Sequence, residues 1–148
     1  MTETVVVPTA VRRRPRTFIP PLLVVPFIIY NVVAFLVFGA KPEGWAGELF
    51  HVTMVSGVEW QLSWGDLLLV IGLVCLFFEV LKSTNTGRTS IVEHMLSTAL
   101  FVIYLVEFLL VGAAATSVFF LLMMMSLVDV VAGFSISITG AGRDVTME

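Results

Sequence analysis

Residues 63–81 of the chain read SWGDLLLVIGLVCLFFEVL, a short polar start followed by a long apolar run. Ser63 and Asp66 form the S-x-x-D pattern of a capping box, in which each side chain bonds the backbone N–H of the other residue at the start of a helix. Beyond Asp66, only Glu79 carries a charge in this stretch. A helix needs about 20 mostly apolar residues to cross a bilayer, so we predict a membrane-spanning helix over residues 65–81.

The composition extends this conclusion to the whole chain. Of the 148 residues, 58% are hydrophobic and 13% are charged, against about 45–50% and about 25% in soluble domains. A soluble fold cannot bury so much apolar surface, whereas four spans with short connections account for the length. The net charge of −3 argues against nucleic acid as a partner. We therefore predict an all-α membrane protein, a four-transmembrane-helix bundle that forms a single integral membrane domain over residues 1–148.

Three further apolar runs complete the predicted bundle. The first span covers residues 18–38 and contains Pro26, which we expect to kink the helix because proline removes a backbone donor. The third span covers residues 91–111 and follows a second capping box that begins at Ser90. The fourth span covers residues 117–134, so close to the third that the two must be antiparallel neighbours. The remaining segments are an N-terminus (1–16), an outer loop (39–64), an inner loop (82–90) and a C-terminal tail (135–148).

Basic residues fall almost entirely on one side of this arrangement, because Lys41 alone lies in the outer loop. Cytoplasmic loops of membrane proteins carry an excess of lysine and arginine. We therefore place both termini in the cytoplasm, and we expect the membrane to be a bacterial inner (plasma) membrane. The basic residues on the cytoplasmic side are Arg12, Arg13, Arg14, Arg16, Lys82, Arg88 and Arg143.

The outer loop alternates apolar and polar residues, which is typical of β-strands. We predict a β-hairpin over residues 49–64, with a three-residue turn that ends at Gly57 in the left-handed conformation. This register brings all the apolar side chains to one face. It pairs Met54 with Val58, Val52 with Trp60 and Phe50 with Leu62.

An isolated hairpin is marginally stable in water, so its apolar face needs a cover. We expect this face to rest on the bundle or on the membrane interface, where Trp45, Trp60 and Trp64 would serve as anchors. The hairpin is also the predicted contact surface for an external partner. Its predicted interface residues are Phe50, Val52, Met54, Trp60, Leu62 and Trp64.

Carboxylates lie inside the predicted spans, which contain no lysine or arginine. An unpaired charge at the centre of a bilayer costs about 2.5–3.5 kcal/mol on insertion scales. Each carboxylate must therefore be protonated, bound to a cation, close to water or paired with a partner. The four residues are Glu79, Glu93, Glu107 and Asp129.

Three of these acids and His94 lie at a similar depth near the cytoplasmic side. Oxygen and imidazole ligands suit several divalent metal ions, so one hypothesis is a divalent metal held by Glu79, Glu93, His94 and Asp129. The alternative needs no metal. In that case Glu79 pairs with Lys82 along its helix, and Glu93 belongs to the second capping box.

A polar stripe runs along one face of the third span, because residues at heptad spacing share a helix face. It comprises Glu93, Ser97, Tyr104 and Glu107, and Asn31 of the first span is a candidate hydrogen-bond partner for Glu107. Such a stripe suits a proton or cation path, and it also suits hydrogen bonding between neighbouring helices, which is the commoner role of polar groups in spans. On the second span, the small residues Gly65, Gly72 and Cys75 predict close helix packing.

The layout of four spans, inner termini and a two-stranded first outer loop with tryptophan resembles the claudin architecture. Claudins carry a W-GLW-C-C pattern in that loop. The outer loop of this chain contains no cysteine, so neither their disulfide nor their junction-forming role is carried over.

No enzyme signature is present, since the sequence has neither a glycine-rich phosphate loop nor a nucleophile and base at a telling spacing. We therefore predict a small non-enzymatic polytopic membrane protein that acts through assembly. Its partners would be the lipid bilayer and either further copies of itself or another membrane protein whose complex it joins as an accessory subunit. The alternative is a proton or divalent-cation transporter or channel that uses the intramembrane carboxylates.

Overall fold

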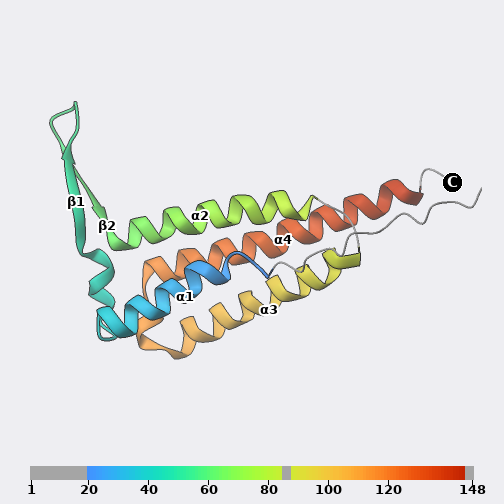
Figure 1. Cartoon of the computed structure of the whole chain (residues 1–148), viewed down its shortest axis with the longest axis horizontal. Helices are drawn as coiled ribbons and strands as arrows, with labels where there is room; N and C mark the ends of the chain where they lie inside the picture. Colours follow the sequence, from blue (N-terminus) through green and yellow to red (C-terminus); the bar gives the residue numbers. More distant parts are fainter. Residues whose placement is uncertain (1–19, 85–87, 146–148) are drawn as a thin grey trace, which may run out of the picture.

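The computed structural model describes residues 20–84 and 88–145. The predicted basic N-terminus and the ends of several predicted segments lie outside these residues. Within them, four helical segments run side by side, and a two-stranded hairpin stands at one end of the bundle (Figure 1). The elements in chain order are α1 (Val24–Val32), the π-helix η1 (Val33–Val37), the 3-10 helix η2 (Pro42–Ala46), β1 (Glu48–Thr53), β2 (Glu59–Ser63), α2 (Trp64–Ser83), α3 (Arg88–Leu110), the 3-10 helix η3 (Gly112–Ala114) and α4 (Ser117–Val145).

In the part of the chain that the structure describes, three helical segments are long and apolar enough to cross a membrane. They are Trp64–Ser83, Val92–Leu110 and Ser117–Ile136. The first apolar segment is a shorter helix, Val24–Val37. The chain therefore has the helices of an integral membrane protein together with a small antiparallel sheet.

The first helix starts later than predicted, and the predicted kink at Pro26 is wrong. Pro26 lies in the first turn of α1, which begins at Val24. Backbone N–H groups in the first turn have no acceptor within the helix, so a proline there removes no hydrogen bond. The irregular part of the segment is instead η1 at its other end, where the Phe38 N–H donates to the Val33 carbonyl oxygen at 3.0 Å.

The two predicted capping boxes have different outcomes. The box at Ser63 is confirmed: the Asp66 N–H donates to Ser63 Oγ at 3.1 Å, and the Ser63 N–H donates to Asp66 Oδ2 at 2.9 Å. The box at Ser90 is wrong, because α3 already begins at Arg88 and Ser90 lies within the helix.

The last helix is longer than the predicted span. Helix α4 continues to Val145, past the predicted end at residue 134.

The predicted register of the hairpin is confirmed. Phe50 pairs with Leu62 and Val52 pairs with Trp60. The Met54 N–H donates to the Val58 carbonyl oxygen at 2.9 Å. Gly57 closes the turn with a φ of 81°, a left-handed conformation that glycine adopts without steric cost.

Helix α4 packs against both α2 and α3, and the glycines of α2 permit one of these contacts. Gly65 and Gly72 are buried. A Cβ atom on Gly72 would lie 2.7 Å from Leu122 Cδ2 and 3.0 Å from Met125 Sδ, both on α4. Cys75 is half-buried and packs against the same core. The small residues of α2 therefore lie where α4 approaches, as the sequence predicts.

We expect Gly72→Leu to destabilise the bundle by about 1–3 kcal/mol, the usual range for overpacking a close contact. The matched control is Gly112→Leu, because a Cβ atom on Gly112 would meet nothing within 4 Å. Thermal unfolding of the purified protein in mild detergent, followed by tryptophan fluorescence, measures both variants. Equal midpoints for the two would contradict the packing described here.

Candidate functional site

The carboxylate of Glu79 is held by groups from two segments of the chain. The Leu22 N–H, just ahead of α1, donates to Glu79 Oε2 at 2.7 Å. Lys82, one turn further along α2, donates to Glu79 Oε1 at 3.1 Å. Glu79 is only 3% exposed, so this carboxylate has both a backbone donor and a positive charge inside the protein.

Lys82 also faces Glu93 of α3, with Nζ and Oε2 3.9 Å apart. One ammonium therefore lies between two carboxylates near the end of the bundle where α2 finishes and α3 begins. Among the described residues, no group of three histidine, cysteine or acidic side chains is placed to hold a metal ion. The predicted pairing of Glu79 with Lys82 is thus confirmed, whereas Glu93 faces Lys82 and does not belong to a capping box. The arrangement gives no support to the divalent metal hypothesis.

The other two predicted metal ligands lie at the contact between α3 and α4. Asp129 is 3% exposed and interacts with the side chain of Ser97. The ring of His94 packs against the backbone of Gly133, where a Cβ atom would clash with it, and stacks on Phe134 with ring centroids 6.3 Å apart. These polar groups therefore join two helices.

Tyr104, in the middle of the predicted polar stripe, is completely buried. Its hydroxyl donates to the Leu23 carbonyl oxygen at 3.1 Å. Its ring contacts Phe27 and Phe119, with centroid distances of 4.8 Å and 5.3 Å. The aromatic ring of Tyr104 thus lies between Ser97 and Glu107 along α3, and its hydroxyl is already bonded within the protein.

Two core aromatic residues were not identified from the sequence as parts of the interior. The Tyr30 hydroxyl donates to the Ala113 carbonyl oxygen at 2.7 Å and lies 2.7 Å from Thr116 Oγ1. Trp45 stacks on the Tyr30 ring at 4.5 Å and is 4% exposed, so the prediction that it anchors the chain at the interface is wrong. The available signal was Tyr30 itself, because a tyrosine in an apolar helix needs a partner for its hydroxyl.

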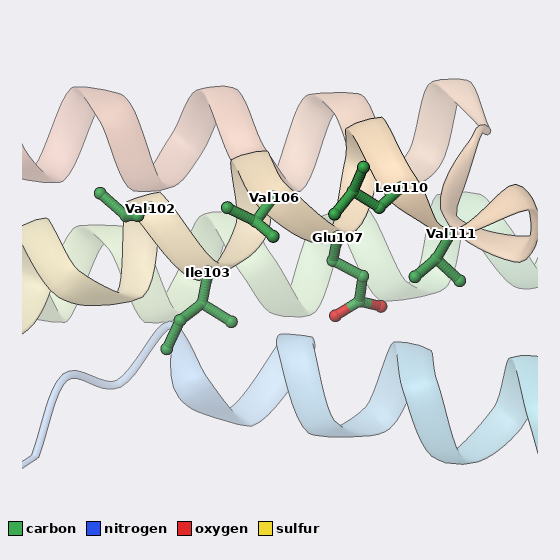
Figure 2. Close-up of a pocket in the computed structure, with 6 residues that line it drawn as sticks. All are labelled: Val102, Ile103, Val106, Glu107, Leu110 and Val111. Atoms are coloured by element: carbon green, nitrogen blue, oxygen red, sulfur yellow. The ribbon is translucent and has the colours of Figure 1, made fainter.

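Glu107 has a different environment from the other carboxylates. It projects from α3 towards α1 (Figure 2) and lines a groove of about 340 Å³. Asn31 of α1 lies near it, but the Asn31 amide donates to the Phe27 carbonyl oxygen at 3.2 Å, and its hydrogen bond to Glu107 stays a prediction. The other residues that line the groove are Val102, Ile103, Val106, Leu110 and Val111.

The apolar face of the hairpin is not covered by the bundle. Phe50, Val52 and Trp60 are 45–47% exposed, although the rings of Phe50 and Trp60 meet edge to face at 6.2 Å. The hairpin points away from the helices (Figure 1). Of the two predicted covers for this face, the bundle is therefore wrong, and the membrane interface stays a prediction.

Removal of the Glu79 carboxylate tests its role in the fold. We expect Glu79→Ala to lower the free energy of unfolding by about 1–3 kcal/mol, because the partly buried Leu22 N–H loses its acceptor and Lys82 loses its nearer partner. Glu79→Gln keeps an acceptor and should cost less. The control is Glu43→Ala at an exposed position in η2. The measurement is the midpoint of thermal unfolding of each purified variant in mild detergent. The same midpoint for Glu79→Ala and Glu43→Ala would contradict this role.

Comparisons of the chain with protein-family models, with curated proteins and with solved structures gave no match. Its function therefore has to be argued from its own geometry. Three features are available for that argument: the neutralised carboxylates near Lys82, the groove beside Glu107 and the uncovered apolar face of the hairpin.

Proposed function

We propose that this chain is a non-enzymatic membrane subunit that acts through assembly, with further copies of itself or with another membrane protein. The observation that carries the proposal is the apolar face of the hairpin, which the bundle leaves uncovered. Close to half of the side-chain surface is exposed at four positions of this face. They are Phe50 and Val52 of β1, Met54 of the turn and Trp60 of β2. A patch of this kind on an otherwise folded protein marks an interaction surface.

The hairpin is attached firmly enough to act as an arm. Ser63 is both the last residue of β2 and the N-cap of α2, so no linker separates the sheet from the helix. The Trp64 N–H donates to the Gly47 carbonyl oxygen at 3.1 Å, which ties the two ends of the hairpin together. The sheet therefore extends sideways from the end of α2 (Figure 1) and would reach past the bundle along the membrane surface.

In this proposal α1 and η1 form a fourth, shorter span. Val24–Val37 covers about 21 Å at about 1.5 Å per residue, less than the hydrocarbon core of about 30 Å. Its two ends nevertheless lie near opposite ends of α2. Leu22, just ahead of α1, bonds to Glu79 near the last turn of α2. Phe38, just after η1, packs against Trp45 at 5.2 Å between ring centroids, and the carbonyl oxygen of Trp45 lies against Gly65 in the first turn of α2.

We further propose that the hairpin is on the outer side and that both termini are in the cytoplasm of a bacterial inner membrane. The support is the distribution of basic residues in the sequence. The end of α2 carries Lys82, whereas Lys41 precedes η2 at the end of the bundle that carries the hairpin. Trp60 and Trp64, both partly exposed, are the residue type that is enriched at such an interface.

The alternative function, proton or divalent-cation transport, has less support. A transport path needs carboxylates that can exchange their cation or proton. Glu79 is instead bonded to the backbone and to Lys82, and Asp129 is buried against Ser97. The buried ring of Tyr104 lies between this end of the bundle and Glu107.

A paired set of hairpin variants tests the assembly proposal. Val52→Thr combined with Met54→Thr makes the apolar face polar, while threonine keeps a high β-propensity. We expect this variant to lose most of the oligomer, or of the co-purified membrane partner, that the unaltered chain shows in lipid nanodiscs. Native mass spectrometry after mild crosslinking measures both.

The matched control carries His51→Thr and Gln61→Thr, which alter the opposite face at paired positions. It should assemble like the unaltered chain. The proposal fails if the unaltered chain is only a monomer without a partner, or if the two double variants assemble equally well.

A further inference from the structure

We propose that Asp129 of α4 binds a proton at neutral pH and serves as a neutral carboxylic acid between α3 and α4. This inference does not depend on the assembly function. Asp129 lies within the apolar segment Ser117–Ile136 and is only 3% exposed. A charged group at such a position in a membrane is costly unless a cation or a proton neutralises it. The charge of Asp129 therefore has to be balanced by its surroundings.

The ammonium of Lys82 does not balance every acid at this end of the bundle. Its Nζ atom lies 3.1 Å from Glu79 Oε1 and 3.9 Å from Glu93 Oε2, and one positive charge balances one carboxylate. Glu79 is nearer to Lys82 and also accepts from the Leu22 N–H. The side chain of Glu93 is 21% exposed, so it can reach water. Asp129 is thus the buried acid of this group that needs another source of neutralisation.

His94 of α3 is the other basic residue near Asp129. Its ring packs against the backbone of Gly133 and stacks on Phe134, about one turn further along α4. The side chain that bonds to Asp129 is instead Ser97 of α3, whose hydroxyl is neutral. A charged imidazole at His94 is therefore the competing source of neutralisation, and a proton on Asp129 itself is the one we propose.

Two buried serines supply partners for a neutral acid. Ser97 is 4% exposed and bonds to Asp129 from α3. Ser126 lies three positions before Asp129 on α4, so the two side chains are neighbours on one face of the helix. Ser126 is 1% exposed, and among the described residues its hydroxyl has no hydrogen-bond partner. A protonated carboxyl has one O–H to donate, and the oxygen of Ser126 is an acceptor for it.

This face of α4 is enclosed by both neighbouring helices (Figure 1). Met125, just before Ser126, meets Gly72 of α2, and Gly133, one turn after Asp129, meets His94 of α3. Among the described residues, no group of three histidine, cysteine or acidic side chains is placed to hold a metal ion. A proton needs no such set of ligands, so it suits this enclosed position better than a metal.

Nuclear magnetic resonance of labelled aspartate tests the proposal directly. The carboxyl carbons of Asp66, Asp129 and Asp144 are the aspartate signals of the full chain, and the signal that disappears in Asp129→Asn is that of Asp129. In nanodiscs at neutral pH we expect this signal at the chemical shift of a protonated acid. The internal control is Asp66, which accepts from the Ser63 N–H at an exposed helix start and should give the shift of a carboxylate.

The pH dependence of stability gives a second readout. Unfolding exposes Asp129 to water, where it ionises, so the folded chain binds one more proton than the unfolded chain. Stability is then full at low pH and is lost as the pH rises, by up to about tenfold in the folding equilibrium for each pH unit. Asp129→Asn keeps a neutral side chain of the same shape and should lose this dependence.

The matched comparison isolates Asp129 from its titratable neighbours. These are Glu79 and Lys82 of α2 and Glu93 and His94 of α3, and all four are present in both the unaltered chain and Asp129→Asn. The difference between their two curves of thermal midpoint against pH, measured in mild detergent, therefore reports Asp129 alone. If Asp129→Asn does not fold, Asp66→Asn and Asp144→Asn identify the remaining labelled signal by elimination.

Three results would overturn the proposal. The first is an Asp129 carboxyl signal at the position of a carboxylate at neutral pH in the unaltered chain. The second is such a signal that becomes protonated in His94→Gln, which would assign the neutralising charge to the imidazole. The third is the same pH dependence of stability in the unaltered chain and a folded Asp129→Asn variant.

Discussion

A carboxylate inside an apolar helix can be accommodated only if something neutralises it, and the bonds of Glu79 meet this constraint within the chain. Its two oxygens accept from the backbone ahead of α1 and from Lys82 of α2. Lys82 in turn faces Glu93 of α3. One group of charges thus fixes where the first helix starts and how the second and third helices lie beside each other. Deletion of the Glu79 carboxylate would therefore disturb the start of α1 and the placement of α2 and α3 together.

Neutral polar groups in the interior also have partners within the chain. The Tyr30 hydroxyl bonds to the carbonyl oxygen of Ala113 in η3, and the Tyr104 hydroxyl bonds to the carbonyl oxygen of Leu23 at the start of α1. Their rings meet at Phe119, which is completely buried. Tyrosine is therefore useful here because it fills the core and bonds at the same time. Glu107 differs because its neighbour on α1 is Asn31, a neutral amide.

Patterns of neighbouring residues in the sequence predicted the hairpin register and the Ser63 capping box, because both features depend on residues close together in the chain. The alternation of residues 50–54 and 58–62 and the glycine at position 57 were enough for the hairpin register, since strand period and turn geometry determine it. The Ser63 box was recognisable for the same reason. Hydropathy also indicated the long helices, but it could not show that α1 starts at Val24, because that start depends on a bond to Glu79 some 57 positions away. The burial of Trp45 depends likewise on its stacking with Tyr30, and only a three-dimensional arrangement reveals such contacts.

We propose that the carboxylates near Lys82 maintain the fold and that the chain works through its contacts with other membrane proteins. The decisive measurement is the flux of protons and divalent cations into liposomes that contain the purified, full-length chain. We expect this flux to be no greater than that of protein-free liposomes. Flux above that level that is lost in folded Glu79→Gln or Asp129→Asn variants would contradict it, because the same carboxylates would then be conducting groups.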